Sequence, residues 1–202
     1  MNNYRYIIGI DEVGRGPIAG PVAVGAFVFL KPSARDLFDG IKESKQLTEK
    51  KREEWFVKIC EAQREGMVDF SISFQSEKVI DKKGISFAIK ESVKMCLEKL
   101  KMKLNIKSNE IQILLDGGLK APEEYEYQKT IIKGDEKEML IALASVVAKV
   151  SRDKEMKILG KKYPQYGFEK NKGYGTSDHY TSISKYGVST PHRMSFLRKI
   201  KV

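Results

Sequence analysis

Apolar residues recur along the chain in patterns that predict five β-strands. Most of these runs are short and rich in β-branched residues, which is typical of strands buried inside a sheet. One run, residues 67–74, instead alternates apolar and polar positions, so we expect Asp69, Ser71 and Ser73 to share a solvated face. The predicted strands are residues 4–11, 21–30, 67–74, 110–118 and 129–135.

Helical periodicity fills the intervals between the strands. Thr48 is a favourable N-cap for a helix that runs to about Arg64. Apolar residues spaced as on one helix face predict a second helix over 85–100, and residues 138–150 are so apolar and alanine-rich that we expect a helix buried against the sheet. A short helix is expected near 178–186. Alternating helices and strands indicate an α/β fold with a mixed sheet and a C-terminal extension.

The composition is that of a globular protein with a strongly basic balance. The 202 residues are 41% hydrophobic and 32% charged, with a net charge of +10. This charge is compatible with a solubilising surface, and also with a polyanionic partner such as nucleic acid. The sequence shows no apolar run long enough to span a membrane and no secretory signal, so a cytoplasmic protein is expected. Cys60 and Cys96 are expected to be reduced thiols.

The stretch "GIDEVGRGPIAGPVAVGAF" matches the spacing of a dinucleotide-binding fingerprint but does not fit its structure. That fingerprint needs a helix to begin at the glycines, because the helix N-terminus binds the pyrophosphate. Here Pro17 and Pro21 lead into a predicted strand. Asp11 and Glu12 would also repel a pyrophosphate. A nucleotide cofactor is therefore a poor interpretation of this loop.

Four carboxylates support a different interpretation. Asp11, Asp116 and Asp135 each end a predicted strand, and Glu12 follows Asp11. Strands that pair in parallel would bring Asp11 and Asp116 to one edge, where close carboxylates repel unless a cation lies between them. Oxygen ligands suit Mg²⁺ or Mn²⁺, and two such ions about 3.5–4 Å apart serve phosphoryl displacement. Considered singly, Asp135 could be only a helix cap and Asp116 only a turn residue.

At these residues the sequence resembles type 2 ribonuclease H, the ribonuclease HII family. The resemblance is carried, in order along the chain, by "DEVGRGPIAGP" (11–21), "ESKQL" (43–47), "LLDGG" (114–118), "GDEK" (134–137), "ASVVAKVSRD" (144–153) and "YPQYGFEKNKGYGT" (163–176). It implies a ribonuclease H-like fold with a mixed five-stranded sheet flanked by helices. A catalytic domain would span residues 1–160, and a helical C-terminal segment that binds substrate would span 161–202.

The resemblance further implies a monomeric endonuclease that cuts the RNA strand of RNA–DNA hybrids and nicks DNA on the 5′ side of single embedded ribonucleotides, for ribonucleotide removal. Asp11, Glu12, Asp116 and Asp135 would hold two Mg²⁺ or Mn²⁺ ions, and the products would carry 3′-hydroxyl and 5′-phosphate ends. Gly14, Arg15 and Gly16 would contact the ribose 2′-hydroxyl, and Tyr174 would meet the deoxyribose that follows.

Other residues of these motifs keep two interpretations. Ser44 and Lys45 are candidate phosphate contacts or an ordinary helix-leading surface, and Tyr174 by itself could be a packing tyrosine. Lys149 and Arg152 could be solvated charges, and His192 and Arg193 are as compatible with structure as with function. Two rivals also remain: another nuclease of the same fold, which would need neither "GRGP" nor "KGYGT", and a hybrid-binding protein without catalysis, which would not need four acids.

Overall fold

The structure, a computed structural model, describes residues 4–41 and 44–197, and for Lys45 the backbone alone. Its centre is a five-stranded sheet in the order β3-β2-β1-β4-β5. β1 pairs with β4 in parallel, as does β4 with β5, whereas β1–β2 and β2–β3 are antiparallel. The strands are β1 (Tyr6–Val13), β2 (Val22–Phe29), β3 (Val68–Gln75), β4 (Ile111–Asp116) and β5 (Tyr127–Ile131). The predicted mixed sheet is thus confirmed.

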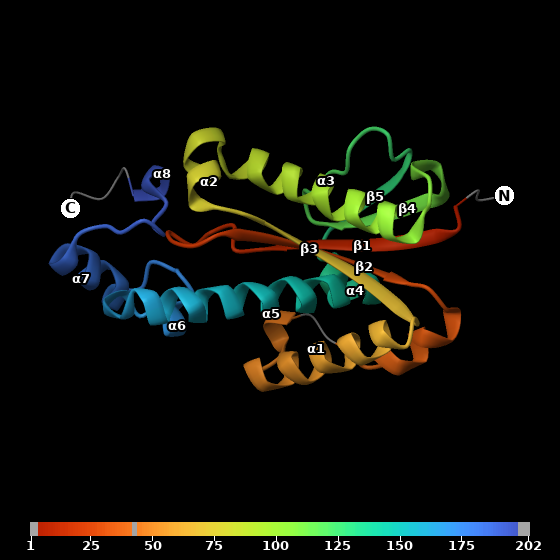
Figure 1. Ribbon diagram of the computed structural model, residues 1–202, viewed down its shortest axis with the longest axis horizontal. Coiled ribbons are helices and arrows are strands. Elements are labelled where there is room, and N and C mark those ends of the chain that lie inside the picture. Colours follow the sequence, from red (N-terminus) through yellow and green to blue (C-terminus); the bar gives the residue numbers. More distant parts are fainter. Residues whose placement is uncertain (1–3, 42–43, 198–202) are drawn as a thin grey trace.

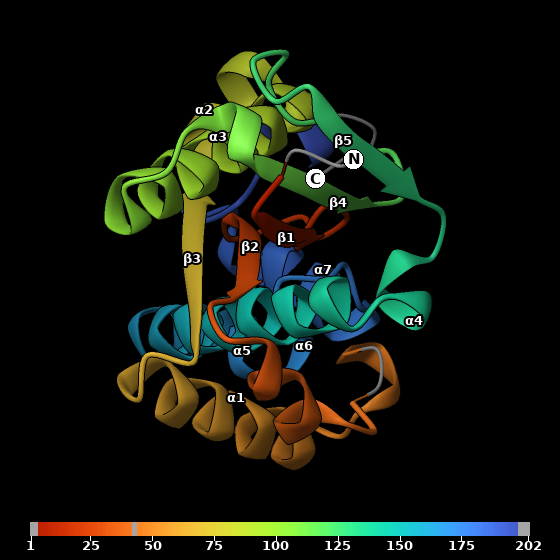
Figure 2. The same cartoon turned by 90° about the vertical axis from the view of Figure 1, so that its right-hand side faces the viewer.

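Helices cover both faces of the sheet (Figures 1 and 2). One face carries α2 (Glu77–Lys83) and α3 (Ile85–Leu104), and the other carries α5 (Met139–Lys162) with α1 (Glu49–Arg64) outside it. Thr48 caps α1 by accepting a hydrogen bond from the Lys51 N–H, as its sequence position predicts. The remaining elements are η1 (Pro32–Phe38), η2 (Ser44–Gln46), η3 (Ser108–Glu110), α4 (Gly134–Lys137), η4 (Pro164–Tyr166), α6 (Phe168–Asn171), α7 (Ser177–Tyr186) and α8 (Met194–Leu197).

Helix α5 lies unusually close to the sheet because two glycines face it. A Cβ atom on Gly9 of β1 would lie 2.3 Å from the backbone carbon of Leu140, and one on Gly25 of β2 would lie 2.4 Å from the Ala144 oxygen. Neighbouring apolar side chains point to the other face, where Ile8 and Ile10 join the core under α3. The predicted buried helix is confirmed, and it continues to Lys162.

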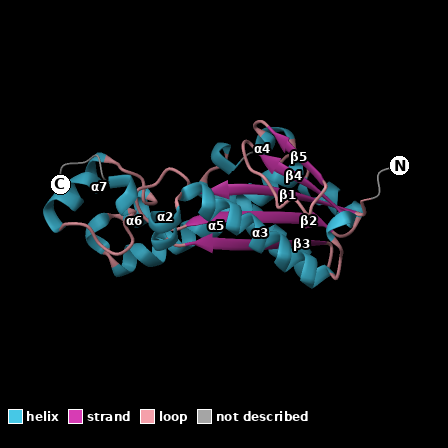
Figure 3. Cartoon of the chain, turned by 90° about the horizontal axis from the view of Figure 1, so that it is seen from above, coloured by secondary structure: helices cyan, strands magenta, loops and turns pink. Residues whose placement is uncertain are grey.

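Beyond the sheet, α5 reaches a small apolar core formed with the C-terminal segment (Figures 1 and 3). Met156 of α5 packs there against residues that follow it and against Ile18 and Ala19, which precede β2. The predicted short helix is present as α7. One helix therefore contacts both the sheet and the C-terminal segment.

Two local predictions are wrong. Asp69, Ser71 and Ser73 of β3 are buried rather than solvated, because α3 covers their face; the Lys103 ammonium, for example, donates to the Asp69 carboxylate at 2.8 Å. The fifth strand ends at Ile131 and not at Asp135. The chain turns at Lys133, whose φ is 55°, and Asp135 lies in α4.

The close approach of α5 predicts that Gly9→Ala destabilises the fold by about 1–3 kcal/mol, because the added methyl group overpacks the helix–sheet contact. Urea unfolding measures the change. Gly118→Ala is the matched control, since a Cβ atom there meets nothing within 4 Å. Equal losses in the two variants would contradict this account of the packing.

Candidate active site

Three carboxylates meet where the parallel pairing of β1 and β4 ends. The last aligned pair of β1 and β4 is Ile10 with Leu115, so Asp11 and Asp116 follow side by side. One oxygen from each of Asp11, Glu12 and Asp116 lies within 4.8 Å of the others. We call these residues the acid triad. The predicted meeting of Asp11 and Asp116 at one sheet edge is therefore confirmed.

The electrostatics of the triad favour a bound cation. Burial raises the pKa of Asp11 to about 8, and Glu12 and Asp116 add to this rise, although hydrogen bonds from Ser145 and the Glu12 N–H oppose it. Burial also raises the pKa of Glu12, against the attraction of Arg15, whose Nη1 lies 3.5 Å from its Oε1. Three carboxylates with only oxygen donors fit a hard divalent cation such as Mg²⁺ or Mn²⁺.

Asp135 lies near the triad but outside the group of oxygens within 4.8 Å. It is 5% exposed in the first turn of α4. The N–H of the preceding residue, Gly134, donates to the Asp116 carboxylate at 2.7 Å, and this bond joins α4 to the end of β4. Asp135 is therefore held near Asp116 by the turn into α4 and not by its position at the end of a strand.

Two buried arginines hold residues 14–21, which we call the glycine loop. Arg193 donates to the carbonyl oxygens of Gly14, Arg15 and Gly20 at 2.8, 3.2 and 2.9 Å. Both Arg193 and Arg152 are 0% exposed. The suggestion that Arg152 is a solvated charge is therefore wrong, and for Arg193 the structure shows a structural role.

Arg152 connects the glycine loop to residues 172–176, the tyrosine loop. Its guanidinium donates to the carbonyls of Pro21 and Ala19 in the first loop and of Lys172 in the second, at 2.8, 3.3 and 3.0 Å. Gly14 has a φ of 92°, and a Cβ atom on it would lie 2.2 Å from the Arg152 Nε, so only glycine fits there. No sequence signal could reveal the role of Arg152 in joining the two loops, because its partners are backbone carbonyls, which every residue has.

The tyrosine loop presents Tyr174 beside the glycine loop. The Gly173 carbonyl accepts hydrogen bonds from the N–H groups of Ile18 and Ala19 at 2.9 and 3.2 Å. A Cβ atom on Gly16 would lie 3.8 Å from Cε1 of the Tyr174 ring, and Tyr174 is 50% exposed. Its ring is thus available to a ligand rather than packed in the core.

A pair of neutral histidines supports the tyrosine loop from behind. His179 Nδ1 lies 2.8 Å from the Tyr174 carbonyl, which can only accept, so this nitrogen carries the proton. Its Nε2 must then accept from His192 Nε2 at 3.1 Å, while His192 Nδ1 accepts from the Ser189 N–H at 2.9 Å. His192 Nδ1 also lies 3.0 Å from the Ser189 hydroxyl and 3.1 Å from the Ser189 carbonyl, and burial lowers the pKa of both rings.

The remaining candidates lie on or near the supports of the triad. Ser44 is 1% exposed, and its hydroxyl bonds that of Ser145 at 2.7 Å, so it reaches Asp11 indirectly. The side chain of Lys45 and the residue Glu43 fall outside the described part of the structure. Lys149 is engaged with Asp153 at 2.5 Å.

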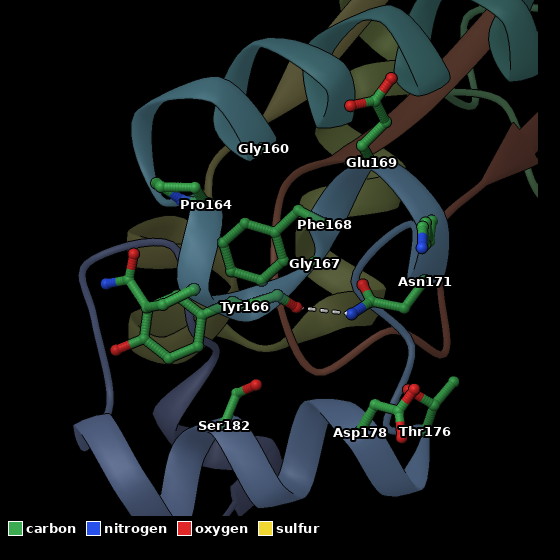
Figure 4. A pocket seen from close by; sticks show the side chains of 12 residues that line it. Gly160, Pro164, Tyr166, Gly167, Phe168, Glu169, Asn171, Thr176, Asp178 and Ser182 are labelled. Carbon is green, nitrogen blue, oxygen red and sulfur yellow. Dashed lines mark hydrogen bonds between the residues drawn. The ribbon is translucent and has the colours of Figure 1, made fainter.

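A cavity of about 620 Å³ lies apart from this site, between the end of α5, α6 and α7 (Figure 4). Its walls include Gly160, Phe168 and Ser182, and the hydrogen bond from Asn171 to the Tyr166 carbonyl lies inside it. Its lining includes Thr176, the last residue of the tyrosine loop, but no residue of the acid triad or of the glycine loop, so the cavity is separate from the carboxylates. In the described ranges, no helix has the length and apolar character needed to cross a membrane.

The chain is similar to known proteins over nearly its whole length. Residues 8–199 match the family model described as Ribonuclease HII. A ribonuclease HII of Caldicellulosiruptor bescii is 42% identical, with 98% of this chain and 89% of the relative covered. That of Clostridium beijerinckii is 46% identical, with 99% and 70% covered. A chain in the structure of the PCNA–ribonuclease HII complex from Archaeoglobus fulgidus has a TM-score of 0.70 at 25% identity, with 98% and 96% covered, which confirms the expected fold.

The histidine pair predicts that the protein loses stability in acid. Burial lowers the pKa of His192 from 6.5 to about 4, so the stability that the pair confers is complete above pH 6.5 and is lost as the pH falls through 4. Urea unfolding of the wild type and of His192→Gln should differ most at pH 7 and converge near pH 4. A difference in unfolding free energy that is constant over this pH range would show that His192 does not titrate with a lowered pKa.

Proposed function

Since the chain belongs to the ribonuclease HII family, it cleaves the RNA strand of RNA–DNA hybrids, and we propose that it also nicks DNA on the 5′ side of a single embedded ribonucleotide. The observation that carries this proposal is the position of the glycine loop between the acid triad and Tyr174. Recognition of one sugar and cleavage of the adjoining phosphate can then share a single nucleotide.

The acid triad and Asp135 are proposed to hold two divalent ions, Mg²⁺ or Mn²⁺. Bound ions would supply the Lewis acid that activates water and stabilises the leaving 3′-oxygen, which gives 3′-hydroxyl and 5′-phosphate ends. The protein's part is to keep Asp11 and Asp116 at adjacent strand ends. The Gly134 N–H and Ser145 fix these two carboxylates by hydrogen bonds.

The hydrogen bonds of the buried Arg193 support a role of the glycine loop in recognising a 2′-hydroxyl. A trans peptide unit directs its C=O and N–H in opposite directions, and the described residues include no cis peptide bond. Arg193 draws the carbonyls of Gly14 and Arg15 inward, so the N–H groups of Arg15 and Gly16 face outward. Neither N–H has an acceptor within residues 4–41 and 44–197. They are therefore two fixed donors for the oxygen of a ribose 2′-hydroxyl.

Tyr174 is proposed to test the sugar that follows the ribonucleotide. Its half-exposed ring adjoins Gly16, so a sugar held at the N–H groups would be followed by one against the ring. A deoxyribose offers an apolar face to an aromatic ring, whereas a second 2′-hydroxyl would have to be desolvated. The C-terminal segment, residues 161–202, would then contribute to substrate binding through this loop. Ser44 and Lys45 remain proposed contacts to phosphate.

Asp11→Asn and Asp116→Asn should each lower cleavage about a hundredfold or more, which corresponds to roughly 3 kcal/mol of lost transition-state stabilisation. Above pH 8, where the Asp11 carboxylate is charged, both should raise the melting temperature of the metal-free protein, by about 2–4 °C for each kcal/mol of repulsion removed. The exposed Asp36→Asn is the control and should change neither quantity. Wild-type turnover in a folded triad variant would refute the assignment of that residue.

Three labelled duplexes test the proposed specificity: one with a single ribonucleotide, one with a full RNA strand, and one of DNA alone. The wild type should cut the first two and leave the third intact. Tyr174→Ala should lose more activity on the single-ribonucleotide duplex than on the full hybrid, whereas Tyr174→Phe, which keeps the ring, should not. Tyr186→Ala, another exposed tyrosine, is the control. Cleavage of the full hybrid but not of the single-ribonucleotide duplex would refute the proposal.

A further inference from the structure

A second, basic pocket adjoins the acid triad. It has a volume of about 180 Å³ and lies between the glycine loop, the first turns of α3 and the loop that follows β4. Three cationic side chains line it, Arg15, Lys90 and Lys120, together with Ser86 and three further uncharged residues, and none of the described residues in its wall is acidic. We call it the basic pocket. Its members come from three separate segments, so their convergence is a product of the fold.

The basic pocket is next to the triad on two sides. Arg15 reaches Glu12 with its guanidinium, at 3.5 Å. Gly118 stands two residues after Asp116, in the loop that ends with Lys120. An anion in this pocket would therefore be a close neighbour of a group bound at the triad.

In the described part of the chain, Lys90 of α3 and Lys120 of the loop after β4 lack the hydrogen-bond or ion-pair partners that the other lysines of α3 have. Lys94 pairs with Glu98, Lys101 with Glu124 and Lys103 with Asp69, while Lys99 donates to the Ile72 carbonyl. Among the residues that the structure describes, Lys90 and Lys120 have no such partner, and both are exposed. Arg15 is paired with Glu12, whereas no acid among the described residues balances the charges of Lys90 and Lys120, and a bound anion would balance them.

The start of α3 adds to the positive potential. The helix is 20 residues long, its N-cap Gly84 provides no side-chain hydrogen bond, and its first turn carries no acidic residue. Its first N–H groups thus keep their partial positive charge, and Ser86 brings this end of the helix into the pocket wall.

We propose that the basic pocket binds a backbone phosphate of the substrate duplex, separate from the phosphate that is cleaved. The inference rests on the proposed function, because it takes the bound anion to be part of the nucleic acid. Lys90 and Lys120 are then substrate-binding residues that hold the duplex in register with the triad. They contribute to binding of the duplex before the chemical step, and this contribution is the same for ribose and deoxyribose.

The first test measures binding of the single-ribonucleotide duplex without metal ions, so that no cleavage occurs, over a range of salt concentrations. The double variant Lys90→Ala/Lys120→Ala should bind more weakly, and the slope of log affinity against log salt should be shallower by about 0.9 for the one phosphate released. The control Lys94→Ala/Lys99→Ala also removes two positive charges, both from α3 and outside the pocket, and should leave the slope near the wild-type value. Equal slopes for the two double variants would overturn the proposal.

The second test places one uncharged methylphosphonate linkage at each position of the duplex in turn. At one linkage outside the cleavage site, neutralisation should weaken binding by the wild type and have no further effect on Lys90→Ala/Lys120→Ala. If every linkage affects both proteins equally, the pocket does not contact the backbone. Inorganic phosphate distinguishes the source of the anion: competition at millimolar concentration with no sensitive linkage would assign the pocket to free phosphate and overturn the proposal.

These readouts separate the inference from the proposed function. If the wild type failed to nick the single-ribonucleotide duplex, the proposed specificity would fail, while the salt slopes and the linkage scan would still decide whether the pocket binds phosphate. In turnover, Lys90→Ala/Lys120→Ala should raise KM and leave kcat near the wild-type value, since the pocket binds ground state and transition state alike. A loss confined to kcat would overturn the assignment to binding.

Discussion

Two buried guanidinium groups hold the carbonyl oxygens of the glycine loop, and the conformation of this loop beside the acid triad depends on these bonds. Burial lowers the pKa of Arg152 to about 10 and of Arg193 to about 9, so both remain charged at neutral pH. Their hydrogen-bond acceptors are backbone carbonyl oxygens rather than carboxylates. A hydrogen bond to a charged group is worth about 1.5–3 kcal/mol, so these bonds fix the loop in addition to the packing of Ile18 and Ala19 in the C-terminal core. Because the peptide units are trans, the directions of the Arg15 and Gly16 N–H groups are set by the carbonyls that face Arg193.

The charges of the site form two layers. The acid triad stands at the strand ends, where burial and mutual repulsion raise the pKa of Asp11 to about 8. Positive groups surround it without neutralising it: the two arginines lie behind the glycine loop, and the basic pocket lies to one side. A polyanion is attracted by the surroundings, while the acids at the centre repel it unless cations are present. Binding without metal and cleavage with metal are therefore separable properties of the same surface.

The sequence was sufficient for the sheet and for the acids on its best-defined strands. The apolar runs of β1 and β4 were sufficient to predict that Asp11 and Asp116 meet at one edge of this parallel pair, although β1 continues past Asp11 to Val13 alongside β2. Asp135 was misplaced because the chain leaves β5 through a left-handed residue, Lys133, that no periodicity marks. The serines of β3 were misjudged because burial under α3 is a tertiary contact. The roles of Arg152 and Arg193 could not be predicted, since their partners are main-chain atoms.

The continuity of helix α5 limits which sequence changes the molecule can accept during evolution. Ala144 rests against the sheet, Arg152 binds the two loops, and Met156 enters the C-terminal core, all along one uninterrupted helix. An insertion of one residue between Ala144 and Arg152 would rotate everything beyond it by about 100°. The guanidinium would then leave the loops while the sheet contact persisted. The sheet contact and the loop contacts are thus linked through the geometry of one helix, so substitutions along α5 can be accommodated one at a time, whereas an insertion or deletion within it would move the guanidinium away from the loops.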